Sequence, residues 1–408
     1  EDGWTQVVVP CRNHRQVDIF ALTDPARLVI DVTPPTSEPG EKGEEASAAQ
    51  ATGKSGPRQT VTPEQATAKS TAPSLWRTMT WPTAAGQALV HLVLVKPSPQ
   101  TVLIRPALGG PLVRSLCSVS YIARVHHALA AINGGFFSPT HKVPLGMLVI
   151  DGEWMRAPLP HRPVLAIMRD GHCEIARVQF DARVHFEGLG YLPVLGLNQN
   201  HWEDNSIVVY TYRWGSQVGP AVNTTRLVVS ARGRVVYRST DGKPVPLPAG
   251  GMVISGCGKR AESLKKVPLG CQVKLKVATK PQWPDMVHAL GGGPLLVAAG
   301  KAVLNPSYEG FRSDVASGRR PRTAVGILKD GRVVLVAAEG RPLGRGPGLS
   351  LWELTKLMLK LGAQSAMNLD GGSSTTLVVK GRTVTHCSAG APRPVNNALV
   401  VVPASQQH

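Results

Sequence analysis

The most informative stretch of this 408-residue sequence is Met367-Asn368-Leu369-Asp370-Gly371-Gly372-Ser373-Ser374-Thr375-Thr376. It follows a strand-like run with a carboxylate, two glycines and several hydroxyl side chains. Glycines let a backbone approach a ligand closely, and backbone N–H and hydroxyl groups can surround a charged group. The stretch therefore predicts a polar loop at the end of a strand, where a charged ligand can bind.

Short β-type runs recur before this loop. Asp-Gly pairs at 170–171, 241–242 and 330–331 are strong hairpin signals between such runs. The expected strands are Leu89–Val95, Val102–Arg105, Gly146–Ile150, Pro163–Met168, Ser206–Tyr212, Thr225–Val229, Gln272–Ala278 and Arg332–Ala337.

Two segments have a helical period instead, 118–129 and 350–362. The second opens on Ser350 with Glu353 three residues later, which is a capping box, and it ends on Gly362. The whole pattern predicts the α+β class, with a mixed, largely antiparallel β-sheet core and a few helices.

The composition divides the chain into three parts. Residues 1–33 form a small β segment, with strands expected at Gln6–Val9, Val17–Phe20 and Arg27–Val32. Residues 34–75 are rich in Pro, Gly, Glu, Ser and Thr and are expected to be a flexible linker. Residues 76–408 are expected to form the large domain that carries the chemistry.

The chain carries 45 Lys and Arg against 27 Asp and Glu, a net charge of +18. Such a surface attracts polyanions, including nucleic acid and anionic cell-wall polymers. Nucleic-acid binding would require clustered basic residues interleaved with aromatic ones, and this pattern is absent from the sequence. We therefore expect no nucleic-acid partner, and either an anionic cell-wall polymer or a basic surface without a dedicated partner.

No run of 18 apolar residues is present, so we expect no transmembrane segment. The sequence opens with Glu1 rather than Met, which suggests a processed product whose signal peptide has been removed. The six cysteines are scattered without a C-x-x-C pair, which argues against a zinc site. Cys257 and Cys271 either close a short loop as a disulfide or remain free thiols.

Three further segments contain small residues that do not suit a packed strand. Asn133-Gly134-Gly135-Phe136-Phe137 combines glycines with an aromatic wall suited to a sugar face, and Gly291-Gly292-Gly293-Pro294 can present N–H groups to an anion. The third begins at Arg319 and leads through a strand to Glu339-Gly340-Arg341. Taken singly, each can also be an ordinary turn or loop.

In their order and spacing, these segments resemble the phosphodiester glycosidase family over roughly residues 76–403. The likeness is densest from Arg322-Thr323-Ala324-Val325-Gly326 to the Asp370 loop, and it closes with the strand-like run 393–401. Two departures are Ser373, where the family more often has a third glycine, and Glu339, where it commonly has Asp. Separately, residues 19–32 resemble the end of an AMIN-type module that targets the cell envelope.

The family resemblance implies cleavage of a sugar C1–O–phosphate bond in a carbohydrate phosphodiester. This chemistry requires a carboxylate near C1 and cationic or N–H stabilisation of the departing phosphate. The expected catalytic residues are Asp370 as base or nucleophile, Glu339 as second carboxylate and Arg322 as phosphate clamp. The expected substrate-binding residues are Asn133, Gly134, Phe136, Phe137, Thr323, Gly371, Gly372, Ser373 and Ser374.

Three other functions remain open from the sequence. Ser373 and Ser374 beside glycines fit a serine hydrolase, although the G-x-S-x-G motif is missing. A non-catalytic protein that binds envelope polysaccharide, such as a wall polymer or peptidoglycan, fits the basic charge. No cofactor is expected, although a divalent ion at Asp370, with ligands from His126, His127, His141 and Glu339, is conceivable. The expected location is extracytoplasmic, either secreted or in the cell envelope.

Overall fold

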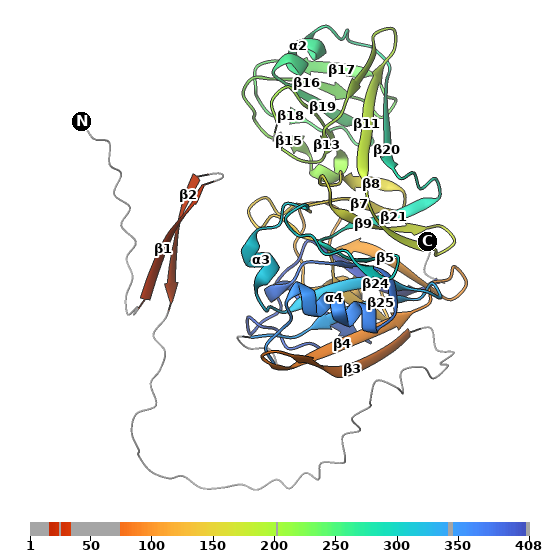
Figure 1. Cartoon of the computed structure of the whole chain (residues 1–408). Helices are drawn as coiled ribbons and strands as arrows, with labels where there is room; N and C mark the ends of the chain where they lie inside the picture. Colours follow the sequence, from red (N-terminus) through yellow and green to blue (C-terminus); the bar gives the residue numbers. More distant parts are fainter. Residues whose placement is uncertain (1–15, 24–25, 34–73, 201–202, 342–345, 405–408) are drawn as a thin grey trace, which may run out of the picture. The chain divides into compact units, whose positions relative to one another are not determined.

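The computed structural model describes all residues except 1–15, 24–25, 34–73, 201–202, 342–345 and 405–408 (Figure 1). The chain divides into two compact units, residues 1–59 and 60–408. In the first unit, β1 (Gln16–Thr23) pairs antiparallel with β2 (Ala26–Thr33). These strands match two expected ones, whereas the expected strand Gln6–Val9 and nearly all of the expected linker lie outside the described residues.

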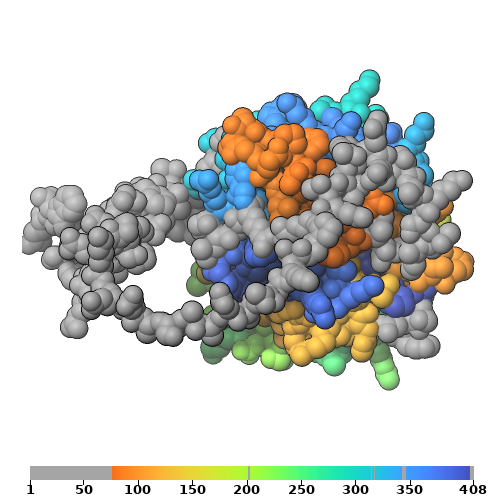
Figure 2. Space-filling view, turned by 90° about the horizontal axis from the view of Figure 1, so that it is seen from below, coloured from red at the N-terminus to blue at the C-terminus, as the bar shows by residue number. Residues whose placement is uncertain are grey.

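The main sheet of the second unit has seven antiparallel strands, in the order β23-β22-β26-β24-β25-β4-β3. Its bounds are β23 (Lys301–Ala302), β22 (Leu295–Ala298), β26 (Ala363–Asn368), β24 (Arg322–Leu328), β25 (Val333–Ala338), β4 (Gly86–Val95) and β3 (Ser74–Thr83). The β3–β4 hairpin lies on the molecular surface, in orange in Figure 2. Because side chains alternate along each strand, this sheet has two distinct faces.

A second, five-stranded antiparallel sheet has the order β28-β27-β6-β29-β5. Its bounds are β28 (Arg382–Thr383), β27 (Leu377–Val379), β6 (Ala130–Asn133), β29 (Asn397–Pro403) and β5 (Val102–Leu108). The third has the order β10-β9-β21-β7-β8, with β10 (Cys173–Arg177), β9 (Pro163–Met168), β21 (Met286–Gly291), β7 (Leu148–Ile150) and β8 (Glu153–Arg156).

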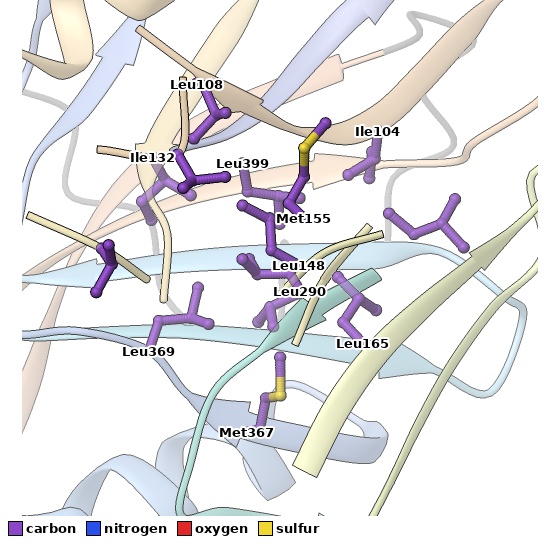
Figure 3. Packing of buried hydrophobic residues seen from close by; sticks show 14 of the residues in the cluster. Ile104, Leu108, Ile132, Leu148, Met155, Leu165, Leu290, Met367, Leu369 and Leu399 are labelled. Atoms are coloured by element: carbon purple, nitrogen blue, oxygen red, sulfur yellow. The ribbon is translucent and has the colours of Figure 1, made fainter. Parts of the chain in front are cut away.

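These three sheets share one apolar core, to which each contributes one face. Figure 3 shows Ile132 and Leu399 of the second sheet near Leu148 and Leu290 of the third, with Met367 of the main sheet close by. Burying a side chain of this size stabilises the fold by about 1.5–3 kcal/mol. The core therefore fixes the end of β26, from which the Asp370 loop starts.

The strands drawn in green in Figure 1 form a separate lobe of the second unit. One sheet has the order β12-β11-β20, another β13-β14-β19-β16-β17, and β15 pairs with β18. The bounds are β11 (Gln179–Phe186), β12 (Gly190–Pro193), β13 (Gly196–Leu197), β14 (Ile207–Thr211), β15 (Gln217–Val218), β16 (Thr224–Val229), β17 (Val235–Ser239), β18 (Val245–Pro246), β19 (Met252–Cys257) and β20 (Val273–Lys280). Only β13 and β14 pair in parallel among the described strands.

Helices are short. They are α1 (Val119–Val125), α2 (Lys259–Lys265), α3 (Ser313–Ser317) and α4 (Leu351–Lys360), with single 3₁₀ turns at Tyr212–Trp214 and Gly372–Ser374. The α4 capping box is present as expected, since the Ser350 hydroxyl accepts from the Glu353 N–H at 3.2 Å and the Glu353 carboxylate accepts from the Ser350 N–H at 2.8 Å. Leu354 and Leu357 of α4 pack on Ala324 and Val336, which point to one face of the main sheet.

The expected sheet-rich fold with few helices is confirmed, and its largely antiparallel pairing is confirmed too. The α+β label gives the helices more weight than they have, because the structure is mostly β. Cys257 and Cys271 are free, which makes the disulfide alternative wrong. Within the described residues, no helix is long and apolar enough to cross a membrane.

Candidate functional site

Asp370 and Glu339 lie at the same edge of the main sheet. Asp370 follows β26 by two residues, and Glu339 directly follows β25. β24 runs antiparallel between these strands and begins at Arg322. The two carboxylate residues therefore flank the start of β24, about two strand spacings or ~10 Å apart at the backbone.

Asn133 holds the Asp370 loop in place. Its Oδ1 accepts from the Thr323 hydroxyl at 2.9 Å and from the Thr376 N–H at 3.1 Å, and its Nδ2 donates to the Asp370 carbonyl at 2.6 Å. The side chain is fully buried. The expected contact of Asn133 with a sugar is therefore corrected to a positioning role, and Thr323 shares that role because its hydroxyl is committed to Asn133.

The glycines after Asn133 allow backbones to pack closely. The Gly134 carbonyl accepts from the Asp370 N–H at 3.2 Å. A Cβ atom on Gly134 would collide with the Asn397 side chain, and one on Gly135 would collide with the Gly291 carbonyl oxygen. These glycines bring the segment after β6 against the Asp370 loop and against residues 291–294, hereafter the glycine loop.

Gly371 and Gly372 do not offer the free N–H groups that the sequence led us to expect. The Gly371 N–H donates to the Asp370 carboxylate at 3.0 Å, and the Gly372 N–H donates to the Pro321 carbonyl at 2.8 Å. Ser374 is buried, whereas Ser373 is half-buried. The structure therefore leaves Ser373 as the accessible hydroxyl of the pair and gives the two glycines a role in shaping the loop.

Burial raises the pKa of the Asp370 carboxyl to about 6. The Ser374 hydroxyl, the Arg393 charge and the Gly371 N–H lower it, but they do not offset the loss of water. Arg393 also donates to the Ser373 hydroxyl at 3.3 Å, and its guanidinium lies 5.2 Å from the centre of the Phe137 ring. The site thus contains a cation beside Asp370 that the sequence analysis did not assign.

Arg322 is turned away from this edge, which contradicts its expected role as phosphate clamp. Thr323 points toward Asn133, so the alternation of a strand sends the neighbouring Arg322 side chain to the face covered by α4. There its guanidinium donates to the carbonyls of Leu349, Val315 and Gly318 at 3.0, 3.0 and 2.7 Å. The side chain is 3% exposed, and burial lowers its pKa to about 10.

Glu339 is enclosed rather than open to a substrate. Its Oε1 accepts from His91 Nε2 at 2.8 Å and from the His386 N–H at 2.9 Å, and it lies 3.1 Å from His386 Nδ1. The Glu339 side chain is fully buried, whereas the His386 side chain is 49% exposed. Glu339 therefore cannot contact a ligand directly as expected, and His386 is the exposed member of the pair.

The two expected aromatic residues differ in exposure. Phe137 is buried at 7% exposure, so it lies beneath Arg393 and does not stack on a sugar. Phe136 is half-buried, and its ring centre lies 5.5 Å from that of Phe311. Arg162 covers Phe311, with 3.4 Å from the guanidinium carbon to the ring centre. Phe136 thus remains available, together with two residues that the sequence analysis did not single out.

Comparison with known proteins decides the family. Residues 223–402 match the family model described as phosphodiester glycosidase. Human N-acetylglucosamine-1-phosphodiester alpha-N-acetylglucosaminidase is 37% identical over 87 residues, which are 20% of this chain and 16% of the human protein. Residues 223–402 are a phosphodiester glycosidase domain. The domain includes Asp370, Glu339 and Arg322, whereas Asn133 lies outside the matched residues.

Other relatives extend the likeness. The SPbeta prophage-derived uncharacterized protein YomE of Bacillus subtilis is 34% identical over 83 residues, or 20% of this chain and 13% of YomE. A solved structure of a hypothetical protein from Synechocystis has a TM-score of 0.74 and 26% identity, covering 95% of this chain and 68% of that one. A candidate exported protein from Burkholderia pseudomallei K96243 has a TM-score of 0.65 and 25% identity, covering 79% and 75%. The curated relatives are matched over well under two thirds of their length.

The residues of the alternative metal site do not gather around Asp370 in the phosphodiester glycosidase domain. No group of three His, Cys, Asp or Glu side chains among the described residues could hold a metal ion. His126 instead contacts the Leu108 carbonyl at 3.0 Å, at the end of α1. A cavity of about 870 Å³ is lined by Tyr210, Trp214 and Arg226 of the other lobe and by His141, but by none of the expected catalytic or substrate-binding residues.

Sequence reasoning therefore missed Arg393, His386 and Arg162. Arg393 opens the run 393–401 and could have been found there as a cation near the closing strand of the family pattern. His386 had a weak signal, because it is the histidine that follows the Asp370 loop most closely. Arg162 had no signal in the sequence, since it belongs to no motif and stands directly before the first residue of β9.

Proposed function

We propose that this protein hydrolyses the sugar C1–O–phosphate bond of a sugar-1-phosphodiester, of the N-acetylglucosamine-1-phosphodiester type or a cell-envelope glycan. The observation that carries the proposal is the Asp370 carboxyl, whose pKa is raised to about 6 and which sits at a hydroxyl-rich loop of a phosphodiester glycosidase domain. A carboxyl with such a pKa is ionised near neutral pH and can still exchange its proton.

The chemistry of the bond fits the groups present. The leaving group is a phosphate monoester, which is stable as an anion and needs less proton donation than an ordinary sugar alcohol. The carboxylate of Asp370 acts at C1, either on water as a base or directly as a nucleophile. Arg393 and the Ser373 hydroxyl, 3.3 Å apart, provide positive charge and a polar contact for the leaving phosphate.

Glu339 acts through His386 in this proposal. A buried carboxylate against Nδ1 fixes the orientation of an imidazole. His386 then presents Nε2 from a half-exposed side chain at the same edge of the sheet. Glu339 is a positioning residue, and the longer side chain relative to the usual Asp of the family lets it reach both His91 and His386.

The location and targeting are also proposed. The AMIN-like residues 19–32, which contain parts of β1 and β2, would direct an extracytoplasmic enzyme to peptidoglycan or an anionic wall polymer. The structural likeness to a candidate exported protein and the net charge of +18 support this location. The alternative function is envelope polysaccharide binding without catalysis.

The test is hydrolysis of N-acetylglucosamine-1-phosphodiesters in oxygen-18-labelled water. Cleavage at the C1–O bond would place the label in the released sugar, whereas cleavage at the phosphorus would place it in the phosphate. Mass spectrometry of both products distinguishes these outcomes. Label in the phosphate contradicts a glycosidase mechanism, and binding of wall polymer without any product favours the non-catalytic alternative.

A further inference from the structure

Arg162 lies in the turn between β8 and β9, next to the proposed site. The carbonyl of the following residue, Pro163, accepts from the Gly292 N–H at 3.0 Å. The next residue of the glycine loop, Gly293, donates its N–H to the Asn368 carbonyl at 2.7 Å, two residues before Asp370. Consecutive hydrogen bonds therefore join the Arg162 turn to the Asp370 loop through the glycine loop.

The guanidinium of Arg162 is held by aromatic rings. It lies 3.4 Å from the centre of the Phe311 ring and 5.8 Å from that of Phe136, which are themselves 5.5 Å apart. A guanidinium stacked on a ring keeps all its N–H groups in its own plane, so stacking leaves them free to bind an anion with two oxygens at once. The rings therefore fix the position of the charge without using its donors.

Arg162 makes no side-chain hydrogen bond among the residues that the structure describes, although the charge of the nearby Glu309 carboxylate acts on it. The contrast with its neighbour Arg177 is direct, because Arg177 donates twice to Glu309 Oε1, at 3.2 and 2.6 Å. The same Glu309 oxygen also accepts from the Leu295 N–H at 3.0 Å. The Glu309 carboxylate is therefore hydrogen-bonded to Arg177 and attracts Arg162 only through its charge, so the N–H donors of Arg162 remain free.

The surroundings of Arg162 remove much of its water. Its side chain is only half-exposed, and burial lowers its pKa to about 10, so the group is still charged at neutral pH. Five half-buried N–H donors that make no hydrogen bond are costly, and a phosphate would supply the acceptor oxygens that they lack. The aromatic surface beside it suits the apolar face of a sugar ring.

We infer that Arg162, stacked on Phe311 and beside Phe136, is a further binding residue for the phosphate of a sugar-1-phosphodiester, in the role that Arg322 does not fill. This inference rests on the proposed function for the identity of the substrate. It assigns Arg162 to binding of the anion and Phe136 to the adjoining sugar or alcohol. Arg393 and Ser373 contact the same phosphate from the Asp370 loop, as proposed above.

The test measures binding separately from turnover. Isothermal titration calorimetry with N-acetylglucosamine 1-phosphate and with N-acetylglucosamine gives the contribution of the phosphate. Arg162→Gln should weaken the sugar phosphate about 10- to 100-fold, because hydrogen bonds to charged groups are among the strong ones, and should leave the uncharged sugar within about twofold. Arg162→Lys should restore only part of the loss, because lysine lacks the planar fork.

The matched control is Arg183→Gln. Arg183 also lies over an aromatic ring, 4.9 Å from the centre of Tyr191, but on β11 in the other lobe. It should change neither affinity. If Arg162→Gln fails to fold by circular dichroism, Phe311→Leu keeps the charge and removes its support, and it should weaken the sugar phosphate about 3- to 10-fold.

The inference would be overturned by an Arg162→Gln protein that binds the sugar phosphate as tightly as wild type, or by equal losses on both ligands. Wild-type protein that does not distinguish the two ligands would overturn it as well. Release of sugar from a phosphodiester is assayed in parallel. Phosphate binding that depends on Arg162 without any turnover would contradict the proposed reaction and leave the anion site standing.

Discussion

Arg322 and Arg162 are both removed from much of their water, yet the protein surrounds them in opposite ways. Arg322, under α4, donates to three backbone carbonyls, and burial lowers its pKa to about 10. Burial lowers the pKa of Arg162 to the same value, but its guanidinium lies against aromatic rings and makes no hydrogen bond among the described residues. Burial alone therefore does not distinguish a structural arginine from one that binds a ligand. The two differ in whether the protein itself provides hydrogen-bond acceptors for the guanidinium.

The same difference separates the two regions around these residues. Under α4, the polar groups are paired within the chain, as in the capping box of Ser350 and Glu353. At the edge that carries Asp370, a carboxyl is kept partly from water with a raised pKa and His386 is half-exposed. A buried carboxyl with a raised pKa lowers the stability of the folded protein, and such a loss is common at sites that bind or react with a ligand.

The largest effect is expected at Asp370. Asp370→Asn keeps the shape but removes the charge that we propose to act at C1, so we expect release of sugar from a sugar-1-phosphodiester to fall by at least about 1,000-fold. The comparison also predicts a stability gain of ~1–3 kcal/mol at pH 8, because one pKa unit corresponds to about 1.4 kcal/mol. An assay of sugar release measures the loss of activity, and denaturant unfolding measures the gain in stability. Activity within a few-fold of wild type would remove Asp370 from the mechanism.

Arg322→Met should act on the other region. We expect it to lower the free energy of unfolding by about 2–4 kcal/mol, because three buried carbonyls lose their donor. Any loss of activity should be equal for sugar-1-phosphodiesters and for simple aryl glycosides. Urea unfolding and assays of both substrates provide the measurement. A selective loss on the phosphodiester would return Arg322 to the phosphate and break the comparison.

The pH dependence sharpens the comparison at Asp370. The pKa of about 6 predicts that kcat/KM rises with pH and levels off above pH 6, with about a tenfold lower value at pH 5. Because this pKa is raised on folding, the stability that Asp370 contributes is present below its unfolded pKa and is lost as pH rises through about 6. The stability of Asp370→Asn relative to wild type should therefore increase only as pH rises through this range. A stability difference that does not change with pH would contradict the assignment.

The smallest effect is expected at the helix cap. Ser350→Ala removes the hydroxyl that accepts the Glu353 N–H at 3.2 Å and should cost about 1 kcal/mol without any change in KM. Thermal unfolding with parallel kinetics provides the check. A changed KM at unchanged stability would show that the α4 side of the sheet affects substrate binding at the Asp370 loop.

Much of the fold could be predicted from local pattern. Strand β9 matches its expected bounds of Pro163–Met168, and α4 begins and ends where its cap residues indicated. The Asp-Gly turn at 330–331 joins β24 to β25, as a hairpin signal should. These features depend on residues a few positions apart, which a sequence displays directly.

The site could be predicted only in part. Asp370 was identified because its loop is unusual by itself, but the direction of Arg322 was not visible, since β24 is buried on both faces and shows no alternation of polar and apolar residues. The contact of His91 with Glu339 joins residues 248 positions apart, and the Arg162 turn reaches the Asp370 loop only through the glycine loop. Such convergence is a property of the folded sheets.

The position of β29 has a consequence for how the enzyme is made. This strand, Asn397–Pro403, lies between β6 and β5, and so it joins two strands that are translated some 260 to 300 residues earlier. Asn397 also holds the backbone of Gly135, next to the Asp370 loop. A ribosome-bound chain that ends before residue 397 therefore cannot assemble the pocket, so we expect the nascent protein to stay inactive until β29 has been translated.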